Sequence, residues 1–248
     1  MSFLFLGLLF ISPFLGSLAA LYSNKYDENK LKLLLSFAGA YLFSITIISL
    51  MPEVYSNSNK YTGMFILAGF WFQILMEKYS KGIEHGHFHL HDVVKKHVIP
   101  FGIIASMCLH TFLEGIPLGA FFQSNASISY SILVGIALHE FPAAFALAII
   151  LKGLKLNNKV IIALMTIYCL ASPIGATLSY SLNYSVPELV FNQFMAFVIG
   201  TFLHISTTIL FESSEHHRFS KLKTYAVLIG VFFALLVVFL EDILIYLA

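Results

Sequence analysis

Charged residues are scarce in this 248-residue chain, and their scarcity decides its class. Only 11% of the residues are Asp, Glu, Lys or Arg, whereas 58% are hydrophobic, and the mean hydropathy is +0.85. A soluble domain carries about a quarter charged residues, so this chain has too few to cover a surface that faces water. The composition therefore excludes an ordinary soluble protein and predicts that lipid surrounds most of the chain.

Three further features are also missing. The chain has only two cysteines, Cys108 and Cys169, and both fall within long apolar runs, so they predict no disulfide framework. The net charge is only +1, which gives no electrostatic reason to bind nucleic acid. No P-loop pattern occurs, which argues against ATP coupling within this chain. The partners expected from composition are therefore the lipid bilayer and small solutes.

Long apolar runs recur along the chain. Each approaches the roughly 20 residues that a helix needs to cross a hydrocarbon core of about 30 Å. An isolated strand would leave backbone groups unpaired in lipid, so these runs are expected to be helical. The first run has no basic residues before it, and we expect it to be retained as a helix and not cleaved as a signal peptide. The sequence thus predicts an all-α, multi-pass membrane protein with eight transmembrane helices and a single domain over residues 1–248. The expected spans are 3–21, 31–52, 61–77, 98–122, 127–151, 160–182, 190–211 and 225–247.

The basic residues are distributed unevenly among the expected loops. If the N-terminus lies outside, 13 of the 14 Lys and Arg residues fall on the cytoplasmic side, and only Lys60 lies outside. Cytoplasmic loops carry an excess of Lys and Arg, so the pattern favours this orientation. We therefore expect both termini to be extracytoplasmic.

Ionisable residues deep inside the expected spans are concentrated in two short segments. Burying such a residue in a membrane costs at least about 2.5 kcal/mol, so it marks function by default. The spacing of His110 and Glu114 places both on one helix face, and His139 and Glu140 follow on the next helix. Imidazole and carboxylate together suit zinc and related divalent ions. The two segments predict a metal site, with a structural His–Glu pair or a proton relay as alternatives. His204 is alone on its helix and is interpreted as structural.

A loop over about 80–97 is rich in histidine. Four imidazoles at alternate positions can bind zinc, copper or nickel in several registers. The predicted orientation puts this loop in the cytoplasm, where it could take up metal leaving the membrane or sense cytoplasmic metal. A flexible polar linker is the alternative. The candidate accessory ligands are His85, His87, His89 and His91.

These segments resemble the ZIP (Zrt/Irt-like) family of divalent metal transporters. The resemblance implies eight helices with both termini outside, a His-rich cytoplasmic loop between helices three and four, and a metal site on helices four and five. It implies import of a divalent ion by elevator-like alternating access, with Zn²⁺ foremost and Fe²⁺, Mn²⁺ and Cd²⁺ as further candidates. It is also compatible with a homodimer in a plasma (inner) membrane. The matching residues are His110, Thr111, Glu114, Gly115 and Gly119 on one helix and His139, Glu140 and Pro142 on the next.

Three positions depart from the family pattern. Ala143 stands where another His or Glu is usual, Ser172 stands where many bacterial relatives carry Glu, and Ser49 stands where His is frequent. Because these ligands are missing, we expect one main metal site. We expect no catalytic residues and no residues that bind an organic cofactor. The expected metal ligands are His110, Glu114 and His139, with Glu140 as a weaker or second-site ligand.

Two other functions fit part of the pattern. An intramembrane zinc metalloenzyme, such as a protease or lipid hydrolase, would use the metal to activate water. The His-Glu-x-x-His motif of such enzymes starts at His139 and Glu140 but fails at Ala143, so we do not expect an enzyme. The missing ligands also leave open a homologue that senses metal without transporting it.

Overall fold

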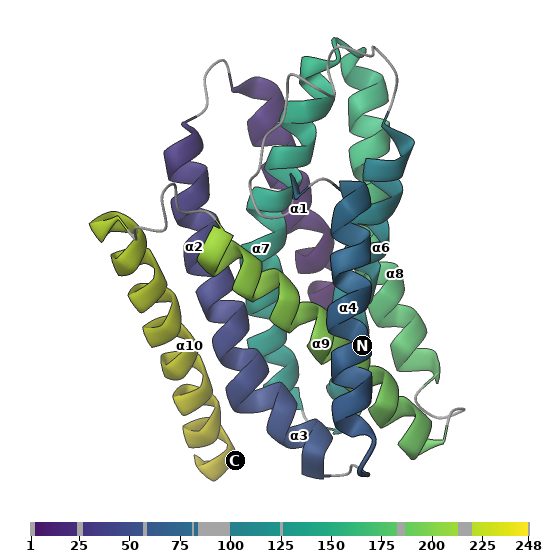
Figure 1. Ribbon diagram of the computed structural model, residues 1–248, viewed down its shortest axis with the longest axis vertical. Helices are drawn as coiled ribbons and strands as arrows, with labels where there is room; N and C mark the ends of the chain where they lie inside the picture. Colours follow the sequence, from purple (N-terminus) through teal and green to yellow (C-terminus); the bar gives the residue numbers. More distant parts are fainter. Residues whose placement is uncertain are drawn as a thin grey trace.

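The computed structural model describes residues 3–23, 27–56, 59–80, 82–83, 100–124, 126–182, 187–212 and 220–247, and these residues form an all-α fold (Figure 1). This confirms the fold class expected from the apolar runs. The helices are α1 (Phe3–Tyr22), α2 (Glu28–Ile45), the π-helix η1 (Thr46–Leu50), α3 (Met51–Ser56), α4 (Thr62–Ser80), α6 (Phe101–Ser124), α7 (Ala126–Gly153), α8 (Asn158–Leu182), α9 (Glu188–Glu212) and α10 (Lys221–Leu247).

Seven helical segments in the described part of the chain are long and apolar enough to cross a membrane. One of them runs without a break from α2 through η1 to the end of α3. Helix α4 is not among the seven, because Gln73, Glu77 and Lys78 fall within its 19 residues. The chain is thus a multi-pass membrane protein, while a membrane span at residues 61–77 stays a prediction.

Local sequence explains where several helices begin and end. The Asp27 carboxylate accepts hydrogen bonds from the backbone N–H groups of Asn29 and Lys30 and so caps the start of α2. Pro52 has no amide hydrogen, and the regular helix changes to the π-helical turn η1 just before it. Lys155 adopts a positive φ of 56°, which ends the helical path of α7.

Helices α1, α6, α7 and α8 form a first group in which backbones touch. A Cβ atom added at Gly115 of α6 would overlap the carbonyl oxygen of Ser172 in α8. A Cβ atom added at Gly16 of α1 would overlap the carbonyl oxygen of Phe141 in α7. Small residues allow such close approach in membranes, where helices gain little from burying apolar surface. These contacts hold the helices of the first group at fixed positions.

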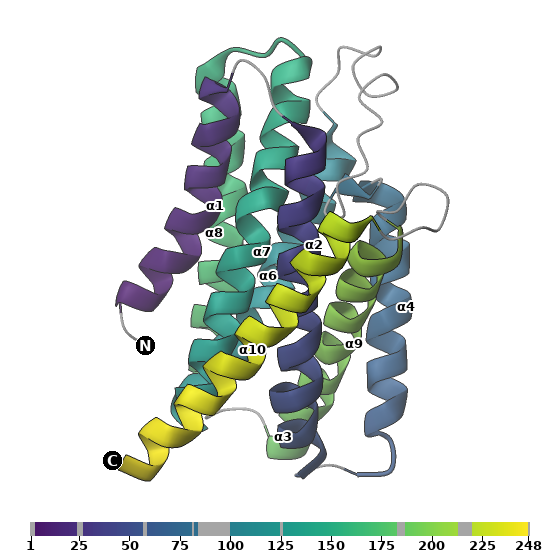
Figure 2. The same cartoon turned by 90° about the vertical axis from the view of Figure 1, so that its left-hand side faces the viewer.

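Helices α2, α4, α9 and α10 form a second group with the same kind of contact. A Cβ atom at Gly69 of α4 would overlap the carbonyl oxygen of Phe197 in α9, and one at Gly230 of α10 would overlap that of Phe37 in α2. Helix α10 lies beside α2 at the edge of the molecule in Figure 1 and crosses in front of it in Figure 2. Among the described glycines, each one whose added Cβ would overlap a backbone oxygen lies at a contact within one of the two groups.

Contacts between the two groups are made by side chains. The Tyr41 hydroxyl of α2 donates a hydrogen bond to the Ser131 carbonyl of α7, at 3.1 Å. Beside it, Gly135 of α7 faces side-chain atoms of α2 and no backbone. The Ser106 hydroxyl of α6 donates to the Met76 carbonyl of α4, at 2.9 Å. These contacts across the boundary thus involve side chains, whereas the glycine contacts within each group bring backbones together.

Replacing the glycine at one of these helix contacts with a larger residue should destabilise the protein. Gly119→Val would push a branched side chain into the backbone of α8 at Ala176. Overpacking of this kind costs about 1–3 kcal/mol. We expect Gly119→Val to unfold several degrees below the wild type in detergent. Gly102→Val on the same helix is the matched control, because nothing lies within 4 Å of its added Cβ. Equal unfolding temperatures for the two variants would contradict the packing described above.

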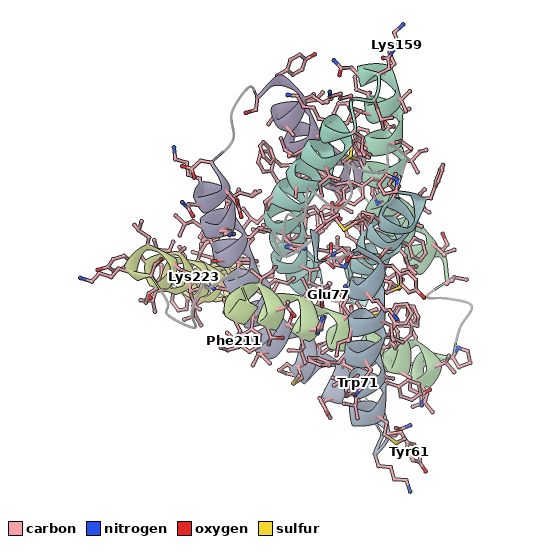
Figure 3. All side chains as sticks on the ribbon, turned by 45° about the horizontal axis from the view of Figure 1, so that its top comes forward. Tyr61, Trp71, Glu77, Lys159, Phe211 and Lys223 are labelled. Atoms are coloured by element: carbon pink, nitrogen blue, oxygen red, sulfur yellow. The ribbon has the colours of Figure 1, made fainter. Side chains whose placement is uncertain are left out.

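The described lysines other than Lys60 lie near helix ends that face the same side of the molecule. In Figure 2 the helices alternate in direction, so α1, α4, α7 and α9 end toward the top, while α1 starts and α10 ends in the lower half. Lys159 lies at one extreme of Figure 3, and Tyr61, next to Lys60, lies at the other. The chain ends and Lys60 therefore lie toward the end that is poor in lysine. The lysines at the rich end are Lys30, Lys32, Lys78, Lys152, Lys155, Lys159, Lys221 and Lys223.

A polar layer divides the apolar core at mid-height. On α6, Met107 belongs to one buried apolar cluster and Ile116 to the other. On α7, Ala143 belongs to the first cluster and Ile136 to the second. The four predicted metal ligands lie between these residues on the two helices. The fold therefore places them far from either end of the bundle.

Candidate metal site

Three of the predicted ligands come together between α6 and α7. His110 and Glu114 are one turn apart on α6, and His139 faces them from α7. The Glu114 Oε1 atom lies 3.4 Å from His110 Nε2 and 3.7 Å from His139 Nε2. The two imidazole rings are nearly perpendicular, with centroids 5.8 Å apart. One ligand atom from each residue lies within 4.8 Å of the other two.

These distances fit a divalent ion. Ligands about 2.0–2.1 Å from a tetrahedral zinc ion are about 3.3 Å from one another. The separations of 3.4 and 3.7 Å need only small side-chain adjustments to reach that geometry. Three protein ligands leave the fourth position for water or an incoming ligand. The arrangement can therefore bind an ion and also exchange it.

The site is buried, and several of its polar atoms make no hydrogen bond within the described residues. His110, Glu114 and His139 are only 2%, 1% and 0% exposed. Within the described part of the chain, both ring nitrogens of His139 and both carboxylate oxygens of Glu140 have no hydrogen-bond partner. An unsatisfied buried polar group costs about 1–3 kcal/mol. Such an arrangement is suited to a ligand from outside the chain.

Glu140 occupies a neighbouring position. It is fully buried, but it does not belong to the three-residue cluster. Its carboxylate interacts electrostatically with that of Glu114 and lies near Ser172 of α8. Two carboxylates buried together are unfavourable unless a cation lies near them. This placement is compatible with a weaker or second-site ligand, and that role stays a prediction.

Tyr168 of α8 also faces this polar layer, and the sequence analysis did not single it out. It is fully buried and lies near Glu140 and Thr111. A tyrosine within an apolar run gives little signal alone. Its spacing of four residues from Ser172, one of the positions that departs from the family pattern, places both side chains on one face of α8. That spacing could have predicted the position of Tyr168.

His204 forms a pair that the sequence analysis did not predict. Its Nε2 atom lies 2.7 Å from Glu77 Oε2 of α4, and Phe70 packs edge-on against its ring, with centroids 5.0 Å apart. The Thr208 hydroxyl lies 3.5 Å from the same nitrogen. In the sequence, Glu77 stands at the end of the expected span 61–77. Its partner is 127 residues away, so no local spacing predicts the pair. The pairing depends on the register between α4 and α9.

The His-rich loop lies outside the described residues. The accessory role of its histidines therefore stays a prediction. The residues concerned are His85, His87, His89 and His91.

Comparison with known proteins finds that the chain is similar to zinc transporters. The model of the family described as ZIP zinc transporter matches residues 87–238, which is more than half of the chain. Zinc transporter ZIP9 of Xenopus tropicalis is 29% identical over 167 residues, covering 62% of this chain and 52% of that protein. Zinc transporter ZIP9 of Micropogonias undulatus is 30% identical over 155 residues, covering 58% of this chain and 49% of that protein. The chain spans about half the length of the curated relatives it matches.

Proposed function

Since the chain belongs to the ZIP zinc transporter family, we propose that it carries Zn²⁺ across a membrane through a site formed by His110, Glu114 and His139. The buried cluster of these three side chains is the observation that supports this site. Glu140 acts as a weaker or second-site ligand beside it. The family consists of zinc transporters, which agrees with the failure of the enzyme motif at Ala143. Fe²⁺, Mn²⁺ and Cd²⁺ would meet the same ligands and are further candidate cargo.

The lysine distribution supports a direction for the membrane topology. Eight of the described lysines lie at one end of the bundle and Lys60 lies at the other. The positive-inside rule assigns the lysine-rich end to the cytoplasm. Both termini then lie on the outer side of a plasma (inner) membrane, and α4 is the eighth span of a single domain over residues 1–248. Zinc would move from the outer side toward the lysine-rich end.

The grouping of the helices supports alternating access. The site is carried by α6 and α7, which belong to the first group, and backbone contacts hold that group together. Side-chain contacts such as the Tyr41–Ser131 hydrogen bond form the boundary with the second group. The first group, moving against the second as in an elevator, would open the site to one side of the membrane at a time. No group in the chain needs to supply covalent chemistry for this cycle.

Zinc flux into liposomes tests the proposal. The purified protein would be reconstituted in liposomes loaded with a metal-sensitive dye, and Zn²⁺, Mn²⁺, Fe²⁺ and Cd²⁺ would be added outside. We expect saturable flux for the wild type and flux at the level of empty liposomes for His110→Ala/Glu114→Ala, because the variant loses two of three ligands. If the wild type binds zinc but moves none, the proposal fails, and the metal-sensing homologue becomes the better description.

A further inference from the structure

A second polar cluster adjoins the site on α6 and α7, but it lies on different helices. Its centre is the pair of Glu77 on α4 and His204 on α9, with 2.7 Å between Oε2 and Nε2. Figure 3 shows Glu77 where α4 meets α9. The side chains are largely buried, with 22% of Glu77 and 9% of His204 exposed. His204 also interacts electrostatically with His110, so the two clusters are neighbours.

Gln73 gives an independent indication that this place binds something. It precedes Glu77 by one helical turn and shares its face of α4. Gly69, one turn earlier, contacts the backbone of α9, so this face points into the α4–α9 contact. Gln73 is 0% exposed, and neither its amide oxygen nor its nitrogen has a hydrogen-bond partner among the described residues. An apolar residue would avoid this cost, which is about 1–3 kcal/mol.

We propose that Glu77, His204 and Gln73 form a second binding site for the transported divalent cation. This second site is separate from the first site on α6 and α7, to which Glu140 belongs. Glu77 lies next to Lys78, near the lysine-rich end of α4, whereas the first site lies at mid-height. The first site belongs to the first helix group and the second to α4 and α9 of the second group. Relative movement of the groups would therefore pass the ion from one set of ligands to the other. This part rests on the proposed function, since the ion received is the one that the first site releases.

The geometry requires a small adjustment for an ion to enter. Ligand atoms on a tetrahedral zinc ion are about 3.3 Å apart, so the Glu77 and His204 atoms would separate by roughly 0.6 Å. The ion would take the place of the hydrogen between the two atoms, and the imidazole would keep its proton on Nδ1. The partial exposure of Glu77 leaves its side chain room to turn. A carboxylate, one imidazole and an amide oxygen bind zinc less tightly than the first site with its two imidazoles, which suits a site of release.

Counting bound zinc tests the second site. The parent would carry His85→Ser, His87→Ser, His89→Ser and His91→Ser so that the loop does not dominate, and zinc would be measured by equilibrium dialysis in lipid nanodiscs. We expect Glu77→Gln/His204→Gln to bind one zinc equivalent fewer than the parent. Two glutamine amides can still hydrogen-bond to each other, so the α4–α9 contact should persist. The His110→Ala/Glu114→Ala variant should lose the other equivalent and retain this one.

A reciprocal exchange separates a metal site from a structural pair. Glu77→His/His204→Glu keeps both ligand types and should regain the lost zinc equivalent. Unchanged zinc in Glu77→Gln/His204→Gln would overturn the second site, as would a folded exchange variant that fails to regain zinc. A parent that binds both zinc equivalents but carries no zinc into liposomes would contradict the proposed function and still support the second site. A parent that carries zinc into liposomes but binds only one zinc equivalent would support the proposed function and contradict the second site.

Discussion

Zinc should raise the unfolding temperature of the wild-type protein and leave that of Glu114→Gln nearly unchanged. A ligand that binds only the folded state stabilises it by about 2.7 kcal/mol at 100 times its dissociation constant. For a chain of this size, that corresponds to a shift of roughly 5–10 °C. Glu114 is expected to carry most of this effect, because its Oε1 atom lies within 3.7 Å of both histidine nitrogens. Glutamine has the same shape as glutamate but lacks the negative charge that binds the ion.

In a chelating buffer the order of stabilities should reverse. Without a cation, Glu114 and Glu140 place two interacting carboxylates in the buried layer. Replacing Glu114 with a neutral amide of equal size removes the repulsion between the two carboxylates. We therefore expect Glu114→Gln to unfold at or above the wild-type temperature when zinc is removed. A structural role for the carboxylate predicts the opposite, since the variant would then be less stable in both buffers.

Thermal unfolding in detergent, with zinc and with chelator, measures both effects. Glu53→Gln on α3 is the matched control, because it makes the same chemical change outside the polar layer. It should shift with zinc as the wild type does. A zinc-induced shift that survives in Glu114→Gln would place the stabilising ion elsewhere in the chain. It would count against the cluster on α6 and α7 as the main site.

The sequence predicts the membrane class and most of the spans because lipid imposes a simple rule. A segment in hydrocarbon must be apolar, and it must be helical to satisfy its own backbone. The runs at residues 3–21 and 160–182 therefore coincide with α1 and α8 to within a few residues. The rule is weakest at α4, where Gln73 and Glu77 lower the hydropathy. Those residues lie where α4 packs against α9, and a hydropathy pattern does not report contacts between helices.

The candidate site is predictable to the extent that it is local. His110 and Glu114 meet because they are four residues apart on one helix, whatever the rest of the chain does. His139 joins them through the packing of α6 against α7, and the sequence supplies only the similar depth of the two segments. The contact of Glu77 with His204 depends on the register set by Gly69 and other close backbone contacts. No periodicity within α4 or α9 reports that register.

Joining the two helix groups covalently should stop transport. The Ser106 hydroxyl lies 2.9 Å from the Met76 carbonyl, so α6 and α4 contact each other here, and a disulfide between cysteines at these two positions would join the groups. The variant Met76→Cys/Ser106→Cys would be built with Cys108→Ala and Cys169→Ala to remove the native thiols. After oxidation we expect zinc flux to fall to the level of empty liposomes. Reduction should restore it, because the first group can then move again.

A disulfide within one group should be tolerated. A Cβ added at Gly39 of α2 lies 3.1 Å from the Cβ of Ile209 in α9, and its nearest neighbours are side-chain atoms, so Gly39→Cys/Ile209→Cys joins two helices of the second group. Each variant is compared with its own reduced form, which cancels any effect of the substitutions themselves. If the Met76→Cys/Ser106→Cys disulfide forms and flux continues, the groups do not need to move, and zinc passes through a fixed path. If both disulfides abolish flux, the boundary between moving parts does not lie where side-chain contacts replace backbone contacts.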